Sequence, residues 1–360
     1  MKFSNLAPYT VGVIAVGAIV AACSGHGSSP TSTLPGGTGT SLVNHDIVLS
    51  AVGKRFLTTR HLGFHGRRAP ASERLGLYTN QFLLTSANVL GYSKNNRSNG
   101  PPTCSESTGA RVNDIAVDSE GNLIVPNNGS GIQVYSGPSL CGTLLMTIPD
   151  SIGQAADAAA QNAVTGPIVV GHANGTVATC NPSGCTQLTS PNMCMSCYSQ
   201  VAMDKSGNCY ATSLDQNTGK AALWYYAGCS GTGTELGSAQ GFNEGIAEGG
   251  LDVDNKGNLV VLAQGGPSYL TVYSGCGTGT CTLVTGPTAL SGAGGGNDCV
   301  YGHLGRKNER YACGDYTLGQ IDIYSYLPSR TPSYLYSFNN GMVQSNITEA
   351  ASYAPSSKGD

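Results

Sequence analysis

Acidic and amide side chains recur at one place in a repeated pattern, the start of a short apolar segment. The six copies carry three carboxylates, one amide and two glycines there: Asp114, Asp157, Gln200, Gly250, Gly302 and Glu349. If these starts meet around one axis, the carboxylates and the amide could coordinate a hard divalent cation such as Ca²⁺. The alternative is a polar, water-filled funnel that holds no ion. Asp114, Asp157 and Glu349 are therefore weak metal-ligand candidates, without a complete ligand set.

Other catalytic patterns are missing from the sequence. It contains no GxSxG, no HExxH and no P-loop motif. The glycine-rich residues 290–296 lack the lysine of a phosphate-binding loop. His172 and His303 stand apart from other chemistry-bearing residues, and we interpret each as a structural histidine. The catalytic residues, if the protein has any, are unknown from the sequence.

The cysteines indicate an oxidising compartment. There are thirteen of them, and setting aside Cys23 leaves an even number, as expected for a disulfide-bonded exported domain. Spacing predicts three disulfides: Cys180–Cys185, Cys276–Cys281 and Cys299–Cys313. The pairing of the other six cysteines stays open, and one arrangement is Cys104–Cys141, Cys194–Cys197 and Cys209–Cys229. Zinc is the alternative for the Cys-x-x-Cys pair, but no second half-site follows at a suitable spacing.

The N-terminus carries a targeting signal. The apolar run of residues 11–22 is too short for a membrane-spanning helix, which needs about 20 residues. It ends in Val-Ala-Ala-Cys23-Ser, which resembles the lipobox of bacterial lipoproteins. The resemblance implies a signal peptide over residues 1–22 and lipidation of Cys23 as the mature N-terminus. It also implies an extracytoplasmic protein anchored to a bacterial membrane, on the periplasmic face or the cell surface. The alternative is an ordinary secretory signal with an incidental cysteine.

Two further segments precede the folded domain. Residues 23–41 are rich in Gly, Ser, Thr and Pro and predict a flexible tether. Residues 42–76 form a basic linker, in which residues 54–74 hold six of the eighteen Lys and Arg residues. A solvated loop is one interpretation of this linker, and attraction to anionic lipid is the other. The formal net charge of −3 argues against a nucleic-acid partner.

Internal repeats dominate the rest of the chain. Residues 114–125, 200–211 and 250–261 each read as a strand, the motif Asp-x-x-Gly-Asn and a second strand. An aspartate can cap such a turn, and Gly and Asn tolerate its positive φ angles. We therefore assign a structural role rather than cation binding to the aspartates of this motif: Asp118, Asp204 and Asp254.

Weaker copies complete the series. First-strand starts fall 43 to 52 residues apart, and a unit beginning at residue 77 lacks its own first strand. Residues 346–353 have the character of that missing strand. Four short strands per repeat of this length are typical of a β-propeller blade. The sequence predicts an all-β, six-bladed propeller over residues 77–360, with residues 347–353 pairing beside residues 77–83 to complete the first blade.

The repeated Asp-x-x-Gly-Asn-Leu-(Ile/Val)-Val segments resemble NHL-repeat and gluconolactonase/regucalcin-type six-bladed propellers over about residues 77–353. In gluconolactonase-type enzymes a central divalent cation, held by carboxylate and amide oxygens, activates a lactone. The present sequence matches no clear set of those ligands. We expect a membrane-anchored, monomeric binding or scaffolding module for an envelope protein or polysaccharide, with no cofactor. The alternative is a metal-dependent hydrolase or lyase acting on a small sugar-like ester.

Overall fold

The computed structural model describes the second of two compact units of the chain, which span residues 1–45 and 46–360. The described residues are 76–354 except 81–87, 94–97, 110–111, 113, 128–130, 138–140, 237–248, 264–266, 279, 292–298, 306–309, 316 and 340–350. The expected signal peptide, Cys23, tether, nearly all of the basic linker and Glu349 lie outside them. Within the described part of the chain, no helix has the length and apolar character that crossing a membrane requires.

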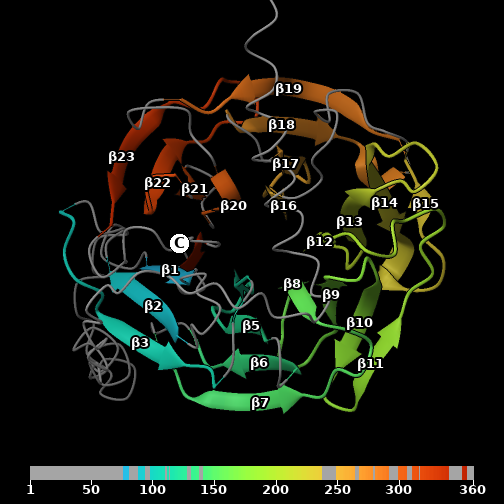
Figure 1. Ribbon diagram of the computed structural model, residues 1–360, viewed down its shortest axis with the longest axis horizontal. Helices are drawn as coiled ribbons and strands as arrows, with labels where there is room; N and C mark the ends of the chain where they lie inside the picture. The colour runs from blue at the N-terminus through green and yellow to red at the C-terminus, as the bar shows by residue number, and fades with distance from the viewer. Residues whose placement is uncertain are drawn as a thin grey trace, which may run out of the picture. The chain divides into compact units, whose positions relative to one another are not determined.

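The described unit is built from β-strands, β1 to β24, which pair into four-stranded sheets arranged around a common axis (Figure 1). The first sheet of consecutive strands contains β4 (Ala116–Val117), β5 (Leu123–Asn127), β6 (Gly131–Tyr135) and β7 (Leu144–Ile148). The second contains β8 (Ala155–Ala160), β9 (Ile168–His172), β10 (Val177–Asn181) and β11 (Gly184–Gln187). The third contains β12 (Gln200–Met203), β13 (Cys209–Leu214), β14 (Ala221–Tyr226) and β15 (Thr234–Glu235).

Two more sheets follow the same order of strands. The fourth contains β16 (Gly249–Val253), β17 (Leu259–Ala263), β18 (Tyr269–Ser274) and β19 (Thr282–Ala289). The fifth contains β20 (Cys299–Leu304), β21 (Arg310–Asp315), β22 (Gln320–Ser325) and β23 (Tyr334–Phe338). Two short 3₁₀ segments, Ala227–Cys229 and Cys276–Thr278, follow β14 and β18. This arrangement of antiparallel sheets around an axis is a β-propeller.

The remaining sheet joins the two ends of the described unit. Its strand order is β24 (Ala351–Ala354), β1 (Gly76–Asn80), β2 (Asn88–Ser93) and β3 (Cys104–Ser107). The pairing of β24 with β1 is antiparallel, with Gly76 opposite Ala354 and Thr79 opposite Ala351. The expected contact between the two ends is therefore confirmed. The expected count of six blades needs correction, because only five blades consist of consecutive strands and the sixth sheet is assembled from both chain ends.

The Asp-x-x-Gly-Asn turns show why the repeats fold alike. Asp254 accepts hydrogen bonds at Oδ1 from the backbone N–H groups of Lys256 and Asn258, both at 2.8 Å. Its Oδ2 accepts 2.8 Å and 3.1 Å bonds from Asn258 Nδ2 and Tyr326 Oη. Asp118 and Asp204 accept the equivalent bonds within their own turns. The structural role assigned to these aspartates is confirmed.

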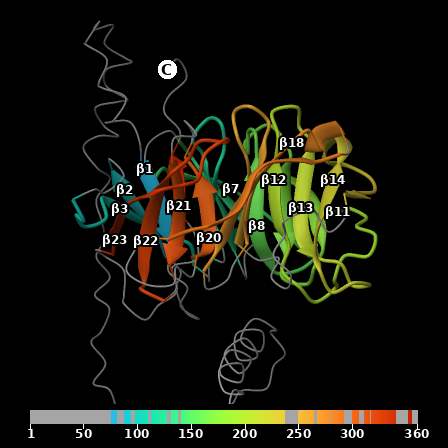
Figure 2. The ribbon, with the colours of Figure 1, turned by 90° about the horizontal axis from the view of Figure 1, so that it is seen from above.

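The hydrophobic core lies between neighbouring sheets, whose strands stand side by side along the axis (Figure 2). β5 and β17 are buried along their whole length, because each sheet packs on both of its faces. Trp224 of β14 is fully buried in the cluster between the β8–β11 and β12–β15 sheets. Its indole Nε1 donates a 2.8 Å hydrogen bond to the carbonyl oxygen of Pro191. Uncharged side chains on both faces explain the low proportion of charged residues.

Six disulfides connect the described cysteines. The three pairs predicted from spacing are confirmed: Cys180–Cys185, Cys276–Cys281 and Cys299–Cys313. The cysteines whose pairing the sequence left open form Cys104–Cys141, Cys194–Cys197 and Cys209–Cys229. A framework of this kind persists in oxidising compartments and favours an extracytoplasmic location.

Candidate binding site on the propeller axis

The polar residues expected at the axis are buried. Asp157 lies within β8 and Gln200 begins β12, which are innermost strands in Figure 1. Asp114 lies just before β4, the strand of its sheet at the opposite end from the outer strand β7. All three have 0% of their surface exposed. They therefore line the interior of the axis rather than an open rim.

Asp114 and Asp157 form a close carboxyl pair. The backbone N–H groups of Ile115 and Ala158 donate 2.7 Å and 2.6 Å bonds to Oδ1 of Asp114 and Asp157 respectively. Oδ2 of Asp157 accepts a 2.6 Å bond from the backbone N–H of Val201, in the next blade. Burial raises the pKa of Asp157 well above its usual value, and the negative charge of Asp114 raises it further. Asp157 thus favours the protonated form.

His303 of β20 joins this pair, although the sequence placed it apart from other chemistry. Its Nε2 lies 3.2 Å from Asp114 Oδ1, and its Nδ1 lies 3.4 Å from Asp252 Oδ1. Burial alone lowers the pKa of His303, but the charges of Asp114 and Asp252 outweigh burial and raise the pKa well above its usual value. The ring is therefore an imidazolium that bridges two carboxylates. We call Asp114, Asp157, Asp252 and His303 the axial cluster.

Gly250 and Gly302, the glycines among the expected first-strand starts, lie against each other in the inner strands β16 and β20. A Cβ on Gly250 would lie 2.4 Å from the carbonyl oxygen of Gly302, so the two glycines let β16 and β20 approach each other. The polar side chains come from the following residues, Asp252 and His303. A carboxylate inside the apolar Leu-Asp-Val segment is the signal that could have identified Asp252.

Both polar side-chain atoms of Gln200 are buried without a partner, whereas Asp114, Asp315 and Asp322 each have one such oxygen in the described structure. Neither Nε2 nor Oε1 of the Gln200 amide has a hydrogen-bond partner, and Oδ2 of Asp114 also lacks one. Gln200 directly precedes Val201, whose backbone N–H binds Asp157 of the axial cluster. An unsatisfied buried polar group costs about 1–3 kcal/mol. Native proteins normally satisfy such atoms with protein groups, ordered water or a ligand.

Asp114 and Asp157, two of the weak metal-ligand candidates, already have partners among protein groups. Among the described residues, no group of three His, Cys, Asp or Glu side chains is placed to hold a metal ion. One oxygen of Asp114 and both oxygens of Asp157 already accept hydrogen bonds from protein groups. Glu349, the third weak candidate, lies outside the described residues.

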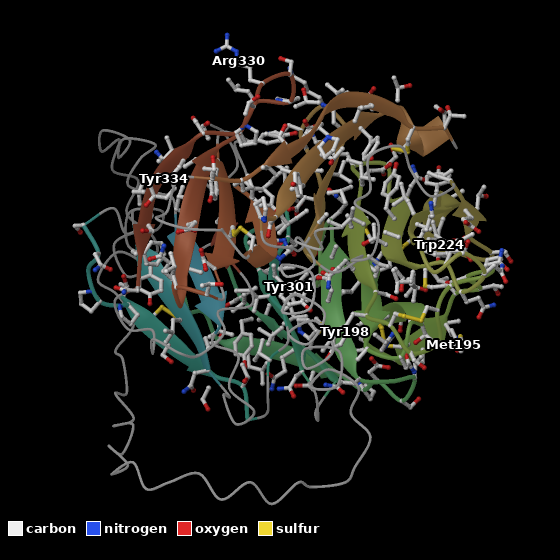
Figure 3. The ribbon with its side chains drawn as sticks, turned by 45° about the horizontal axis from the view of Figure 1, so that its top comes forward. Met195, Tyr198, Trp224, Tyr301, Arg330 and Tyr334 are labelled. Carbon is white, nitrogen blue, oxygen red and sulfur yellow. A yellow bond between two sulfur atoms is a disulfide. The ribbon has the colours of Figure 1, made fainter. Side chains whose placement is uncertain are left out.

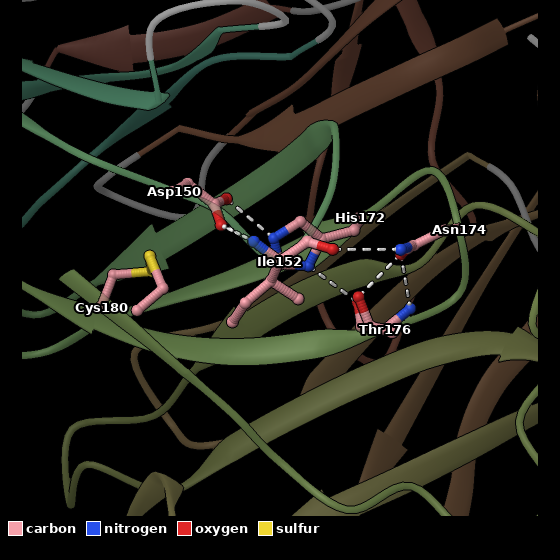
Figure 4. A network of polar contacts seen from close by, with 7 residues as sticks. Asp150, Ile152, His172, Asn174, Thr176 and Cys180 are labelled. Carbon is pink, nitrogen blue, oxygen red and sulfur yellow. Dashed lines mark hydrogen bonds and ion pairs between the residues drawn. A yellow bond between two sulfur atoms is a disulfide. The ribbon is translucent and has the colours of Figure 1, made fainter.

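His172 has the structural role expected from the sequence (Figure 4). Its Nε2 lies 2.8 Å from Asp150 Oδ2, and its Nδ1 lies 3.1 Å from the carbonyl oxygen of Thr176. Burial raises the pKa of Asp150, but the hydrogen bond and charge of His172, with backbone N–H groups, hold it below its usual value. The pair is buried and fixes the β9–β10 turn against the segment that enters β8.

Comparisons with known proteins identify no family. No protein-family model matches the sequence, and neither does any curated protein sequence. The structure is similar to that of the computationally designed Ika8 protein, with a TM-score of 0.41 and 16% identity over 72% of each chain. It is also similar to hydrazine synthase from Kuenenia stuttgartiensis, with a TM-score of 0.37 and 10% identity over 60% of this chain and 76% of that chain. Both likenesses are too weak to bear on function.

Proposed function

We propose that this chain is an extracytoplasmic, lipid-anchored β-propeller that acts as a binding module. The disulfide framework supports an oxidising compartment, and the lipobox-like sequence before Cys23 supports the anchor. The sheet formed by β24, β1, β2 and β3 joins the two ends of the described unit and closes the ring. Closure gives a rigid frame around the axial cluster.

The unsatisfied amide of Gln200 carries the proposal. A ligand that completes the site must accept from Nε2 and donate to Oε1 or to Oδ2 of Asp114. A sugar hydroxyl does both, because it has one donor and two acceptor positions. We therefore propose a hydroxyl-rich ligand, a unit of an envelope polysaccharide. Because Gln200 is fully buried, ligand entry requires local opening, and we expect slow association.

Calorimetric titration tests this assignment. Detergent-solubilised protein is titrated with fragments released from the polysaccharides of the envelope, and we expect saturable binding. Gln200→Leu keeps a similar side-chain volume but removes the amide, so it should lose binding by about tenfold or more. Gln187→Leu, on the exposed end of β11, is the matched control and should bind as the unaltered protein does. Equal binding by both variants would exclude Gln200 from the site.

The same variant should be more stable than the unaltered protein. Replacing an unsatisfied buried amide with an apolar side chain removes its desolvation cost, so Gln200→Leu is expected to gain roughly 1–2 kcal/mol. Urea unfolding followed by circular dichroism measures this change. Loss of binding together with a gain in stability would separate a ligand-binding role from a structural one. A marked loss of stability would indicate that Gln200 supports the fold.

Replacing Cys23 tests the anchor. We expect the mature protein to begin at Cys23 and to partition into the detergent phase of a Triton X-114 extract. Cys23→Ala removes the acylated thiol and should leave the protein in the aqueous phase or with its signal uncleaved. N-terminal mass spectrometry checks both products. A mature N-terminus at any other residue would contradict lipidation.

A further inference from the structure

We propose that the Cys194–Cys197 disulfide is a surface site of thiol–disulfide exchange, which accepts electrons from a dithiol on a protein or peptide. The two cysteines enclose Met195 and Ser196 in the segment between β11 and β12. This inference is independent of the ligand proposed for the axis. It rests on differences in exposure, anchoring and spacing between this disulfide and the others.

Exposure distinguishes this disulfide from the rest. Cys194 and Cys197 are both partly exposed, and Met195 between them is 63% exposed. Figure 3 shows Met195 toward the periphery of the view. Each of the other five disulfides in the described structure has at least one buried cysteine: Cys104, Cys180, Cys209, Cys276 and Cys299. An attacking thiolate must reach a sulfur atom, so burial protects both cysteines of three pairs and one cysteine each of Cys180–Cys185 and Cys276–Cys281.

Anchors on both sides hold the turn without the disulfide. The backbone N–H of Cys194 donates a 2.8 Å bond to the carbonyl oxygen of Leu214. Beyond Cys197, Ser213 Oγ donates a 3.0 Å hydrogen bond to the carbonyl oxygen of Tyr198. The backbone N–H of Ser199 donates a 3.3 Å hydrogen bond to the carbonyl oxygen of His172. Reduction therefore opens the exposed tip and leaves the start of β12 in place.

Reduction of this disulfide should lower the stability of the fold only slightly, because the ring that it closes is short. The two cysteines are three positions apart, the smallest separation of the six disulfides, so opening this ring returns the least conformational entropy to the unfolded chain. Cys194 and Cys197 also lie outside the strands, whereas Cys299–Cys313 joins two paired strands. The Cys-x-x-Cys disulfide therefore contributes little to the framework and can be reduced without loss of the fold.

The exchange proceeds in two balanced steps. A thiolate of the partner attacks one sulfur of the Cys194–Cys197 pair, forming a mixed disulfide and releasing the other cysteine as a thiolate. The second cysteine of the partner, as its thiolate, then attacks the partner's sulfur in the mixed disulfide. This forms the partner's disulfide and releases the attacked cysteine of this chain as a thiolate. Two electrons and two protons pass from the partner to the Cys-x-x-Cys pair. The partner leaves with a disulfide, and this chain holds a dithiol.

Timed reduction tests the selectivity. The oxidised full-length protein is treated with dithiothreitol, quenched with acid, alkylated and mapped by mass spectrometry. We expect Cys194 and Cys197 to be alkylated first, roughly tenfold faster than any other pair, with the thermal unfolding of the protein almost unchanged. Reduction of Cys180–Cys185 or Cys276–Cys281 at an equal or higher rate would overturn the proposal.

Transfer to a dithiol peptide tests the exchange itself. A reduced two-cysteine peptide is incubated with the oxidised protein without oxygen, and we expect about one equivalent of peptide disulfide. The Cys194→Ala/Cys197→Ala double variant should oxidise none of it. The Cys276→Ala/Cys281→Ala double variant is the matched control and should oxidise as much as the unaltered protein. Peptide oxidation that survives loss of Cys194 and Cys197, or no oxidation by the unaltered protein, would refute the site.

Discussion

A chain that ends at Val343 is expected to lose the cooperative unfolding of the intact propeller. The truncation removes β24, which pairs with β1 and contacts the innermost strands β4 and β20 of the neighbouring sheets. Without β24, the edge of β1 that faces away from β2 has no partner strand, so a strand of another chain can pair with it. We expect a loss of more than about 4 kcal/mol, a value that only the removal of buried structure produces. Urea unfolding and size-exclusion chromatography measure the loss and the expected aggregation.

A shorter truncation provides the matched control. A chain that ends at Ala354 keeps all of β24 and loses only residues 355–360, so it should unfold as the full-length chain does. The comparison isolates the strand from the effect of shortening the terminus. If the chain ending at Val343 melted at the same temperature as the one ending at Ala354, ring closure by β24 would be wrong.

The second large effect is expected for His303→Leu. The substitution removes the cation that bridges Asp114 and Asp252, and Asp114 is fully buried. Removing one partner from a buried ion pair leaves an uncompensated charge and costs about 3–5 kcal/mol. Urea unfolding at neutral pH measures this loss. Arg330→Leu removes an exposed cation instead and should change stability by less than about 0.5 kcal/mol.

The pH dependence of the His303→Leu loss identifies its cause. The pKa of His303 is raised in the folded state, so its stabilisation is fully present below its unfolded pKa and is lost as pH rises through the folded value. We therefore expect the loss to be largest below about pH 6 and to shrink as the pH rises above the folded pKa of His303. A loss independent of pH would indicate a packing defect rather than an unpaired charge.

The repeat architecture could be predicted from the sequence because it depends on local chemistry. The turn that contains Asp254 has the same hydrogen bonds in three copies, and each bond is made to residues two or four positions away. The Cys299–Cys313 pair follows from a hairpin of the same kind. The contact between β24 and β1 was also predictable, because a repeat that lacks one strand requires another segment to supply it.

The axial cluster could not be predicted because it depends on contacts between distant blades. His303 lies 189 positions from Asp114, and no local pattern relates them. Strand periodicity places a residue on a face of its own sheet, but it does not say which side chain of another blade lies opposite. Asp252 and His303 show this limit, because nothing in their own repeats indicates that His303 contacts both Asp252 and Asp114.

Native mass spectrometry of protein extracted from its own envelope tests the binding assignment most directly. The account predicts a bound hydroxyl-rich glycan fragment that is released on denaturation and is missing from the Gln200→Leu variant. The Gln187→Leu variant should retain the fragment, because the exposed end of β11 lies outside the axial cluster. One equivalent of a divalent metal in place of the glycan, together with hydrolysis of a sugar-like ester, would contradict the account and indicate an enzyme.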